Sequence, residues 1–310
     1  MVNKILITGA GGFIADNLSN FLNKKGFDIY GIGTRKKTQK SFKQKYKKKI
    51  VCKITCKNLV KNFNSLDFII HCAGSGTDNL NYKKNYQNNF LTTKHIVEFC
   101  LKEKKMPIII FMSSYSLYKD SKLNSFAITE NFKIKPKSSY AKSKKKSEDL
   151  LLKFSKSHGL KIKILRLSSV YGVENKKQLL FDSCKKILNN HAFFLGSGNE
   201  TRDWININDV STLVYKIIKK RNDSNTIINC GFGKSYKVNH VIKLIKKYLK
   251  SNVNISFCKN QNLKSPKNLS LNINLAKSYG WRPKITLRKG LFEYVNWYKS
   301  TFCKENKKKD

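Results

Sequence analysis

Short apolar runs alternate with amphipathic stretches along the first half of the chain. The runs have the length of β-strands, whereas the stretches between them repeat apolar residues every three to four positions, as the buried face of a helix does. Strands are expected at residues 5–7, 28–33, 49–54, 66–72, 107–112 and 161–167, and helices at 13–22, 88–104 and 140–158. This alternation predicts an α/β fold, a doubly wound parallel sheet with helices on both faces.

The pattern is less regular beyond Gly172. Short strands are expected near 205–207 and 226–229, where the chain could rejoin the main sheet, and helices near 178–190, 238–250 and 287–299. We therefore predict two domains. Residues 1–172, rejoined by about 205–235, form the sheet domain, and residues 173–204 together with 236–310 form a smaller C-terminal α/β lobe.

Length and composition are those of a globular protein. A chain of 310 residues, 40% of them hydrophobic, can bury a large core. No apolar run approaches the roughly 18 residues of a membrane span, and the first strand begins too early to leave room for a signal peptide. The eight cysteines include no Cys-x-x-Cys pair, which favours reduced thiols over a metal site or disulfides. We expect a cytoplasmic protein without a metal.

The formal net charge of +44 raises the question of a nucleic-acid partner. Only six of the 63 basic residues are arginines, however, and the lysines are spread over the whole chain. Arginine carries most base-edge recognition because its guanidinium donates in a fork. We therefore expect no specific nucleic-acid partner and only weak attraction to polyanions. The lysine-rich runs 43–49, 142–146 and 304–309 are interpreted as solvated faces or tails.

A glycine-rich segment follows the first strand directly. It reads Thr8-Gly9-Ala10-Gly11-Gly12-Phe13-Ile14-Ala15 and runs into the first helix. Gly9 permits a tight turn with unusual dihedral angles, and Gly12 lets a pyrophosphate approach the backbone. The helix N-terminus then offers free N–H groups and a partial positive charge. Together these features predict a phosphate cradle for a dinucleotide.

The end of the second strand bears on which dinucleotide binds. An Asp or Glu at this point holds the adenosine ribose hydroxyls of NAD, but the strand ends Gly31-Ile32-Gly33-Thr34-Arg35 without a carboxylate. Arg35 can pair with a 2′-phosphate instead, which favours NADP. The alternative is NAD, with Arg35 as one more basic surface residue.

A Tyr-x-x-x-Lys pair is the next candidate for chemistry, because that spacing places both side chains on one helical face. Four such pairs occur, starting at Tyr115, Tyr118, Tyr140 and Tyr215, so context must choose among them. Tyr140 opens a helix, and the strand that ends at Ser114 precedes it. In a parallel sheet both segments reach the carboxyl edge, where ligands bind. A nearby lysine can lower the pKa of a phenol, and the Ser114 hydroxyl could bind the oxygen that Tyr140 protonates.

Further motifs follow in a fixed order and carry a resemblance to a known family. They are His71-Cys72-Ala73-Gly74, Asn89, Ser113-Ser114-x-x-x-Tyr118, Pro136-x-x-Ser139-Tyr140-x-x-x-Lys144-x-x-x-Glu148, Arg166 to Gly172, Gly196-x-Gly198-x-x-x-Arg202-Asp203 and Gly280-Trp281-x-Pro283. With the glycine loop, these segments resemble the extended short-chain dehydrogenase/reductase family of NAD(P)-dependent enzymes that act on nucleotide sugars. Ala15 stands where the family usually has a third glycine. The resemblance implies a Rossmann fold, a substrate-binding lobe and a homodimer.

The resemblance also implies roles for individual residues. Tyr140 would be the acid and base at a sugar oxygen, Lys144 would hold the nicotinamide ribose and lower the Tyr140 pKa, and Ser114 would position the oxygen. The implied cofactor contacts are Thr8, Gly9, Gly11, Gly12, Phe13, Ile14, Arg35, Ala73, Gly74, Asn89, Tyr140 and Lys144. The implied contacts to a nucleoside-diphosphate sugar are Ser114, Ser169 and Arg202.

Departures from the family pattern narrow the reaction. Dehydratases of the family carry Asp-Glu directly after the catalytic hydroxyl, whereas this chain has Tyr115-Ser116, which argues against dehydration. We expect NADPH-dependent reduction of a 4-keto sugar, which Gly33 and Arg35 favour. The alternative is an NAD-dependent nucleotide-sugar 4-epimerase. A third hypothesis is a non-catalytic dinucleotide- or polyanion-binding protein, against which the intact Ser114, Tyr140 and Lys144 argue.

Overall fold

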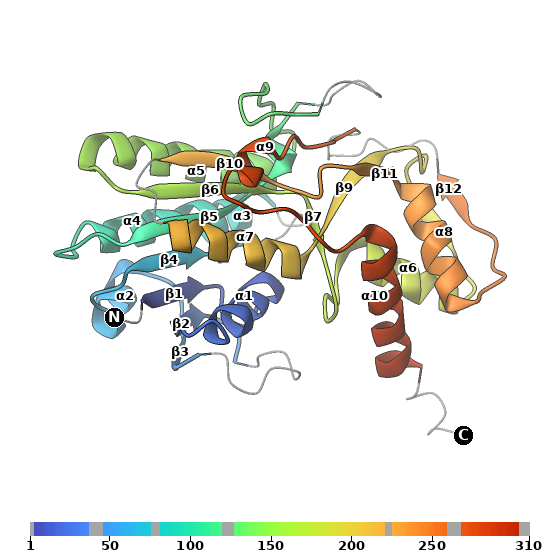
Figure 1. Ribbon diagram of the computed structural model, residues 1–310, viewed down its shortest axis with the longest axis horizontal. Coiled ribbons are helices and arrows are strands. Elements are labelled where there is room, and N and C mark those ends of the chain that lie inside the picture. The colour runs from blue at the N-terminus through green and yellow to red at the C-terminus, as the bar shows by residue number, and fades with distance from the viewer. Residues whose placement is uncertain are drawn as a thin grey trace.

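The computed structural model describes residues 3–36, 46–75, 81–119, 127–220, 225–258 and 268–303. Its largest element is a seven-stranded sheet in the order β10-β6-β5-β4-β1-β2-β3, in which every neighbouring pair is parallel (Figure 1). The strands are β1 (Lys4–Thr8), β2 (Asp28–Gly33), β3 (Lys48–Val51), β4 (Phe68–His71), β5 (Ile108–Ser114), β6 (Ile162–Leu167) and β10 (Thr226–Cys230). The predicted α/β fold with a doubly wound parallel sheet is confirmed.

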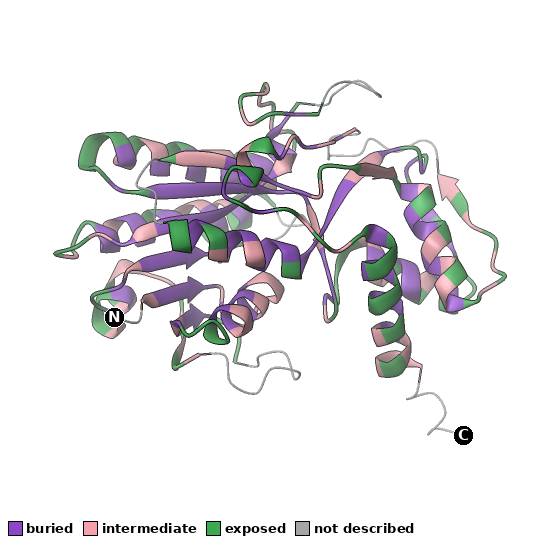
Figure 2. Cartoon of the chain, viewed as in Figure 1, coloured by how far each residue is buried: buried purple, intermediate pink, exposed green. Residues whose placement is uncertain are grey.

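Helices cover both faces of this sheet. One face packs against α1 (Phe13–Asn23) and α7 (Ile207–Lys220) through a cluster that includes Leu18, Leu22 and Leu213. The other face packs against α2 (Cys56–Asn62), α4 (Thr92–Cys100) and α5 (Ser139–His158) through Leu59, Ile96 and others. Because both faces are covered, the central strands are buried along most of their length (Figure 2). That burial explains why the strands are continuous apolar runs rather than alternating ones.

The segment before α4 has an irregular helical geometry. It begins as α3 (Tyr82–Asn85), continues as a π-helical turn η1 (Tyr86–Leu91) and becomes α4 without a break. Asn85 and Asn89 are both buried on its inner side. Single π-helical turns inside α-helices are frequent at functional sites, and this one faces α5.

A smaller assembly follows β6. It contains a three-stranded sheet, β11-β9-β7, and a parallel pair, β12-β8, together with α6 (Gln178–Leu188), α8 (Val238–Leu249) and α10 (Leu287–Phe302). Figure 1 shows these three helices beside one another. The strands are β7 (Ser169–Tyr171), β8 (Phe193–Leu195), β9 (Thr201–Asn206), β11 (Ser235–Lys237) and β12 (Ser256–Cys258); the remaining short elements are η2 (Tyr115–Leu117) and α9 (Asn274–Lys277).

Two expectations about this region differ in outcome. The strand expected near 226–229 does join the main sheet, as β10 beside β6. The strand expected near 205–207 does not: it is the end of β9, which pairs with β7 and β11. The apolar residues Ile205 and Ile207 suggested a core strand, but the chain turns into α7 at Ile207 and packs that helix on α1 instead. The domain boundaries themselves stay a prediction.

Buried carboxylates fix the connections between these parts. Asp203 of β9 accepts hydrogen bonds from the Phe232 and Gly233 amides at 2.7 and 2.9 Å, and burial raises its pKa to about 6. Asp209 of α7 accepts from the amides of Lys284 and Ile285 at 2.9 and 3.0 Å. These carboxylates accept from backbone amides of irregular segments, which have no neighbouring strand to bond to.

Candidate active site

The glycine-rich segment lies at the carboxyl edge of the main sheet, as a dinucleotide cradle requires. The amides of Gly9 and Ala10 donate to the Ile32 carbonyl at 2.8 and 3.1 Å, which turns the loop over the end of β2. Gly9 has a φ of +78°, and a Cβ there would lie 2.9 Å from the Ala73 backbone. Only glycine fits this position. Gly33 is equally enclosed, since its Cβ would lie 2.6 Å from the Ala10 carbonyl oxygen.

Thr8 and the His71 imidazole link this loop to β4. Thr8 Oγ1 accepts from the Ala73 amide at 3.1 Å and lies 2.8 Å from His71 Nδ1, while His71 Nε2 lies 3.0 Å from Thr93 Oγ1. Burial, with Lys144 nearby, holds the pKa of His71 well below its usual range, so the ring is neutral at pH 7. The imidazole is therefore a structural bridge.

Gly74, Asn89 and Lys144 meet at the end of β4. A Cβ on Gly74 would lie 2.3 Å from Asn89 Oδ1 and 3.5 Å from Lys144 Nζ. Asn89 accepts from the Ser75 amide at 3.1 Å and donates to Ser143 Oγ at 2.9 Å. A side chain at 74 would collide with the Asn89 carboxamide, so glycine at this position lets Asn89 and Lys144 lie against the backbone at the end of β4.

Ser114, Tyr140 and Lys144 are brought together by β5 and α5. The Tyr140 hydroxyl hydrogen bonds with Ser114, which lowers the Tyr140 pKa, but burial outweighs this effect and raises the pKa to about 12. Lys144 Nζ donates to the Met112 carbonyl at 2.8 Å and lies 4.6 Å from the Phe111 ring centroid. Burial lowers the Lys144 pKa to about 8. Lys144 is not among the groups that shift the Tyr140 pKa, and its lowering of that pKa stays a prediction.

Two faces of α5 hold these side chains in place. Tyr140, Lys144 and Glu148 follow one another at intervals of four residues toward β5 and β6, where Glu148 pairs with the buried Arg166. A second line, Ser139, Ser143 and Ser147, faces the preceding helix and meets Asn85, Asn89 and Thr93 at 2.8, 2.9 and 3.1 Å. The helix begins at a Ser138 cap, whose hydroxyl accepts from the Ala141 amide.

The remaining predicted contacts are described by their own partners. Arg35 is exposed and donates to the Gly11 carbonyl at 3.2 Å. Ser169 of β7 lies 3.0 Å from the Tyr115 hydroxyl, and its neighbour Ser168 bonds to Asp203 at 3.3 Å. Arg202 of β9 donates to the Thr201 carbonyl and stands opposite Tyr236 of β11. Phe13 and Ile14 open α1 and pack against the core cluster on that face.

Sequence reasoning missed two side chains at the cradle. Asp16 is fully buried, and Tyr46 donates to it. Tyr46 lies in the lysine-rich run 43–49, of which 43–45 are outside the described residues, as is the run 304–309. Lys144, in the run 142–146, is likewise buried rather than solvated. The only feature of the sequence that could have pointed to Tyr46 is an aromatic residue inside a run of lysines.

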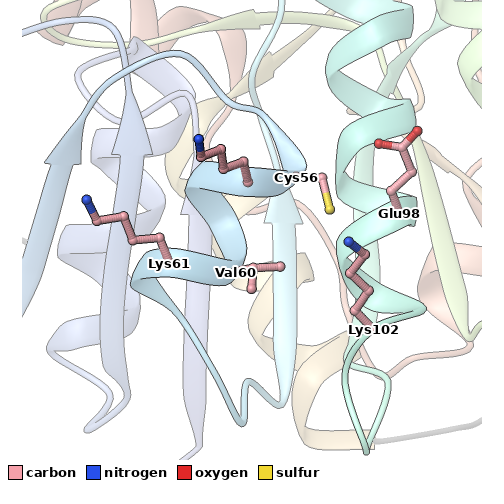
Figure 3. A pocket seen from close by; sticks show the side chains of 6 residues that line it. Cys56, Val60, Lys61, Glu98 and Lys102 are labelled. Atoms are coloured by element: carbon pink, nitrogen blue, oxygen red, sulfur yellow. The ribbon is translucent and has the colours of Figure 1, made fainter.

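Two surface hollows carry no comparable chemistry. One of about 540 Å³ lies between α2 and α4 and is lined by Cys56, Lys57, Val60, Lys61, Glu98 and Lys102 (Figure 3). Another, of about 630 Å³, lies beside β11 and the start of α10. Within the described ranges, no three His, Cys, Asp or Glu side chains gather as a metal site would require. Nor does any described helix have the length and apolarity to span a membrane.

The seven-stranded parallel sheet, with the glycine loop at its carboxyl edge, has the architecture of the extended short-chain dehydrogenase/reductase class. A sequence profile described as the NAD dependent epimerase/dehydratase family matches residues 5–231. The chain belongs to that family. Its sequence is 27% identical, over 96% of this chain and 98% of the relative, to a putative UDP-glucose 4-epimerase of Methanocaldococcus jannaschii.

Solved structures share the fold over nearly the whole chain. A UDP-glucose 4-epimerase from Thermotoga maritima with UDP-glucose has a TM-score of 0.87 at 21% identity and covers 96% of this chain and 99% of its own. A UDP-glucuronic acid 4-epimerase from Bacillus cereus, solved with UDP-glucuronic acid and NAD, has a TM-score of 0.84 at 22% identity, with 96% and 100% covered. These likenesses show the fold over 96% of the chain.

Proposed function

We propose that this protein is a 4-epimerase of nucleoside-diphosphate sugars and uses NAD. The observation that carries the proposal is the convergence of Tyr140, Ser114 and Lys144 beside the glycine cradle. The relatives named above are epimerases, which supports the epimerase alternative over the 4-ketoreductase that the sequence analysis preferred. Arg35, which favoured NADPH and hence a reductase in the sequence, donates to the Gly11 carbonyl of the glycine loop.

NAD, when bound, supplies a reversible acceptor for the hydride of the sugar carbon. The residues that would hold it are the glycine loop, Ala73, Gly74, Asn89 and Lys144, which pack closely together at the carboxyl ends of β1 and β4. NAD rather than NADP fits the solved neighbours that contain NAD. NAD also fits the position of Arg35, because the Arg35 guanidinium already donates to the Gly11 carbonyl.

The side chains then divide the acid–base work. Ser114 hydrogen bonds to Tyr140 and orients the sugar oxygen between the two hydroxyls. In its phenolate form Tyr140 takes the proton from that oxygen as the carbon is oxidised, and the phenol so formed returns the proton when the carbon is reduced on its other face. At neutral pH Lys144 is cationic, because its pKa of about 8 lies above 7. Its positive charge, on the same face of α5 as Tyr140, would favour the phenolate form of that residue.

The substrate would lie between the main sheet and the smaller assembly. Arg202 would hold the diphosphate, since a guanidinium donates to two phosphate oxygens at once. Ser169, next to the Tyr115 hydroxyl, would contact the sugar from β7. Residues 1–172, with the returning segment of about 205–235, would then bind the cofactor, and 173–204 with 236–310 the nucleotide sugar.

The experiment offers UDP-glucose, UDP-N-acetylglucosamine and UDP-glucuronate to the protein with NAD and separates the 4-epimers by chromatography. Tyr140→Phe should lower turnover by about 100-fold or more, as the loss of a general acid–base group does. Tyr215→Phe is the matched control, because Tyr215 also begins a Tyr-x-x-x-Lys pair but packs on Phe21 and Phe27. Consumption of NADPH by a 4-keto sugar, with no epimer formed, would instead establish the reductase.

We also expect a homodimer, and an aromatic face supports it. Tyr82 is 47% exposed and stacks on Tyr86, which stacks on Phe90, with Lys146 of α5 over both tyrosine rings. A second copy of this chain would bury that face. Sedimentation velocity should give a dimer that Tyr82→Glu dissociates, whereas Val60→Glu, at the exposed hollow between α2 and α4, should not.

A further inference from the structure

Asp16 is a fully buried carboxylate beneath the glycine loop, and the proposed mechanism does not use it. It lies in the first turn of α1, four residues after Gly12. Its Oδ1 accepts from the Gly11 amide at 2.8 Å and from the Tyr46 hydroxyl at 2.9 Å. A carboxylate here is favoured by the helix N-terminus, but the two hydrogen bonds give it a definite orientation toward the loop.

Tyr46 reaches this position because Gly31 has no side chain. A Cβ on Gly31 would lie 2.6 Å from the Tyr46 ring, so the ring occupies the space above β2. Burial and the Asp16 charge hold the pKa of Tyr46 far above its usual range, so the phenol keeps its proton and donates. The carboxylate, the phenol and the loop amide therefore form a fixed group.

The same loop residue is held from its other side by Arg35. The guanidinium donates to the Gly11 carbonyl at 3.2 Å. Gly11 has a φ of +87°, a backbone conformation that needs such support to persist in one geometry. Asp16 holds the amide and Arg35 holds the carbonyl, so a negative and a positive group stand on either side of one residue of the cradle.

We propose that Asp16 is a positioning residue of the dinucleotide cradle and that its charge favours NAD over NADP; this rests on the proposed use of NAD. To bind a 2′-phosphate, Arg35 would have to share its guanidinium between that phosphate and the Gly11 carbonyl. The added phosphate would then be repelled by the negative charge of Asp16, because the amide and the carbonyl of Gly11 link Asp16 to Arg35. NAD requires neither change. The pyrophosphate is the same in both dinucleotides, so its repulsion by Asp16 does not affect the preference for NAD over NADP.

The test measures NAD and NADP dissociation constants by titration calorimetry on the full chain, without sugar. Asp16→Ala should weaken NAD binding about tenfold, as loss of a charge-assisted hydrogen bond does. Asp16→Asn keeps an oxygen that can accept from Gly11 and Tyr46, so NAD affinity should stay within about threefold. Because Asp16→Asn removes the charge, the ratio of NADP to NAD affinity should rise about threefold or more.

Asp28→Asn is the matched control, because Asp28 begins the same strand that ends at Gly33 and pairs with Lys47 at 3.0 Å. It should change neither dissociation constant. Unaltered NAD affinity in Asp16→Ala would overturn the positioning role, and an unaltered ratio in Asp16→Asn would overturn the charge effect. If Asp16→Ala does not fold, Tyr46→Phe replaces it: loss of one donor should weaken NAD about threefold and leave the ratio unchanged.

These outcomes are separable from those of the proposed function. The titrations contain no sugar, so a protein that binds NAD and epimerises nothing would refute the reaction and leave the inference about Asp16 intact. A wild-type protein that binds NADP more tightly than NAD would refute the proposed cofactor before any variant is compared. Melting temperatures of each variant separate a loss of folding from a loss of binding.

Discussion

Glu148→Gln should destabilise the protein more than any surface charge substitution on the same helix. Glu148 and Arg166 are 1% and 2% exposed, and they are joined at 2.8 Å and again at 3.2 Å. Ser113 donates to the same carboxylate at 2.5 Å. Glutamine has the same shape but no charge, so Arg166 would stay buried without a counter-ion. Breaking one side of a buried pair costs about 3–5 kcal/mol.

That cost converts into a shift of the melting temperature. With an unfolding entropy of about 2 cal/mol/K per residue over 310 residues, a loss of about 4 kcal/mol lowers the melting temperature by about 6 °C. Differential scanning calorimetry at pH 7.5 measures it. Asp149→Asn is the control: Asp149 is the next residue, 55% exposed, and pairs with Lys145. Its loss should cost under about 0.5 kcal/mol.

A double variant tests the physical reason. Glu148→Met with Arg166→Met removes both charges and should recover part of the loss, because no uncompensated charge remains. Recovery will be incomplete, since Arg166 also donates to the Tyr118 hydroxyl at 3.0 Å and the Glu130 carbonyl at 2.8 Å. A Glu148→Gln loss no larger than that of Asp149→Asn would refute the reasoning. So would a double variant less stable than the sum of the two single losses.

Two further predictions concern charge. Lys144→Met should stabilise the fold by about 2 kcal/mol at pH 7, because burial lowers the Lys144 pKa from about 10.5 to about 8 and one hydrogen bond is lost in return. Since a depressed lysine pKa penalises the fold below pH 8 and is relieved as the pH rises toward 10.5, urea denaturation should show the gain shrinking over that window. Raising NaCl from 50 to 300 mM should raise the melting temperature, because a net charge of +44 repels itself and salt screens it; a fall would contradict this.

Much of the fold could be predicted from the sequence because the central strands are buried on both faces of the sheet. Runs such as Ile5–Ile7 and Ile108–Met112 cannot be anything but core, and glycine and helix starts separate them. The meeting of Ser114 and Tyr140 also followed, since Ser114 ends β5 and Tyr140 opens a helix that begins at the same edge of the sheet. The pairing of β9 did not follow, because Ile205 and Ile207 are as apolar as a central strand and only the register with Ser169–Tyr171 distinguishes them.

Asp16 and Tyr46 could not be found for a different reason. An acidic residue in the first turn of a helix is fully explained by the helix dipole, so Asp16 carried no further signal. Tyr46 lies 30 residues away among lysines, and only the missing side chain of Gly31 lets its ring reach the carboxylate. Such pairings depend on the space between elements, and a linear pattern contains no measure of that space.

The polar ladder on α5 shows what a linear pattern does contain. Ser139, Ser143 and Ser147 recur every four residues, as do Asn85, Asn89 and Thr93 on the preceding helix; the three pairs bond at 2.8 to 3.1 Å. A line of small polar residues looks like a solvated face, but here it allows two helices to approach closely. The adjacent line on α5 carries Tyr140, Lys144 and Glu148. Because two lines fix the rotation of one helix, the position of the Tyr140 hydroxyl relative to Ser114 is set by packing on both sides of it, and a substitution at Ser143 should disturb catalysis although it lies outside the reacting group.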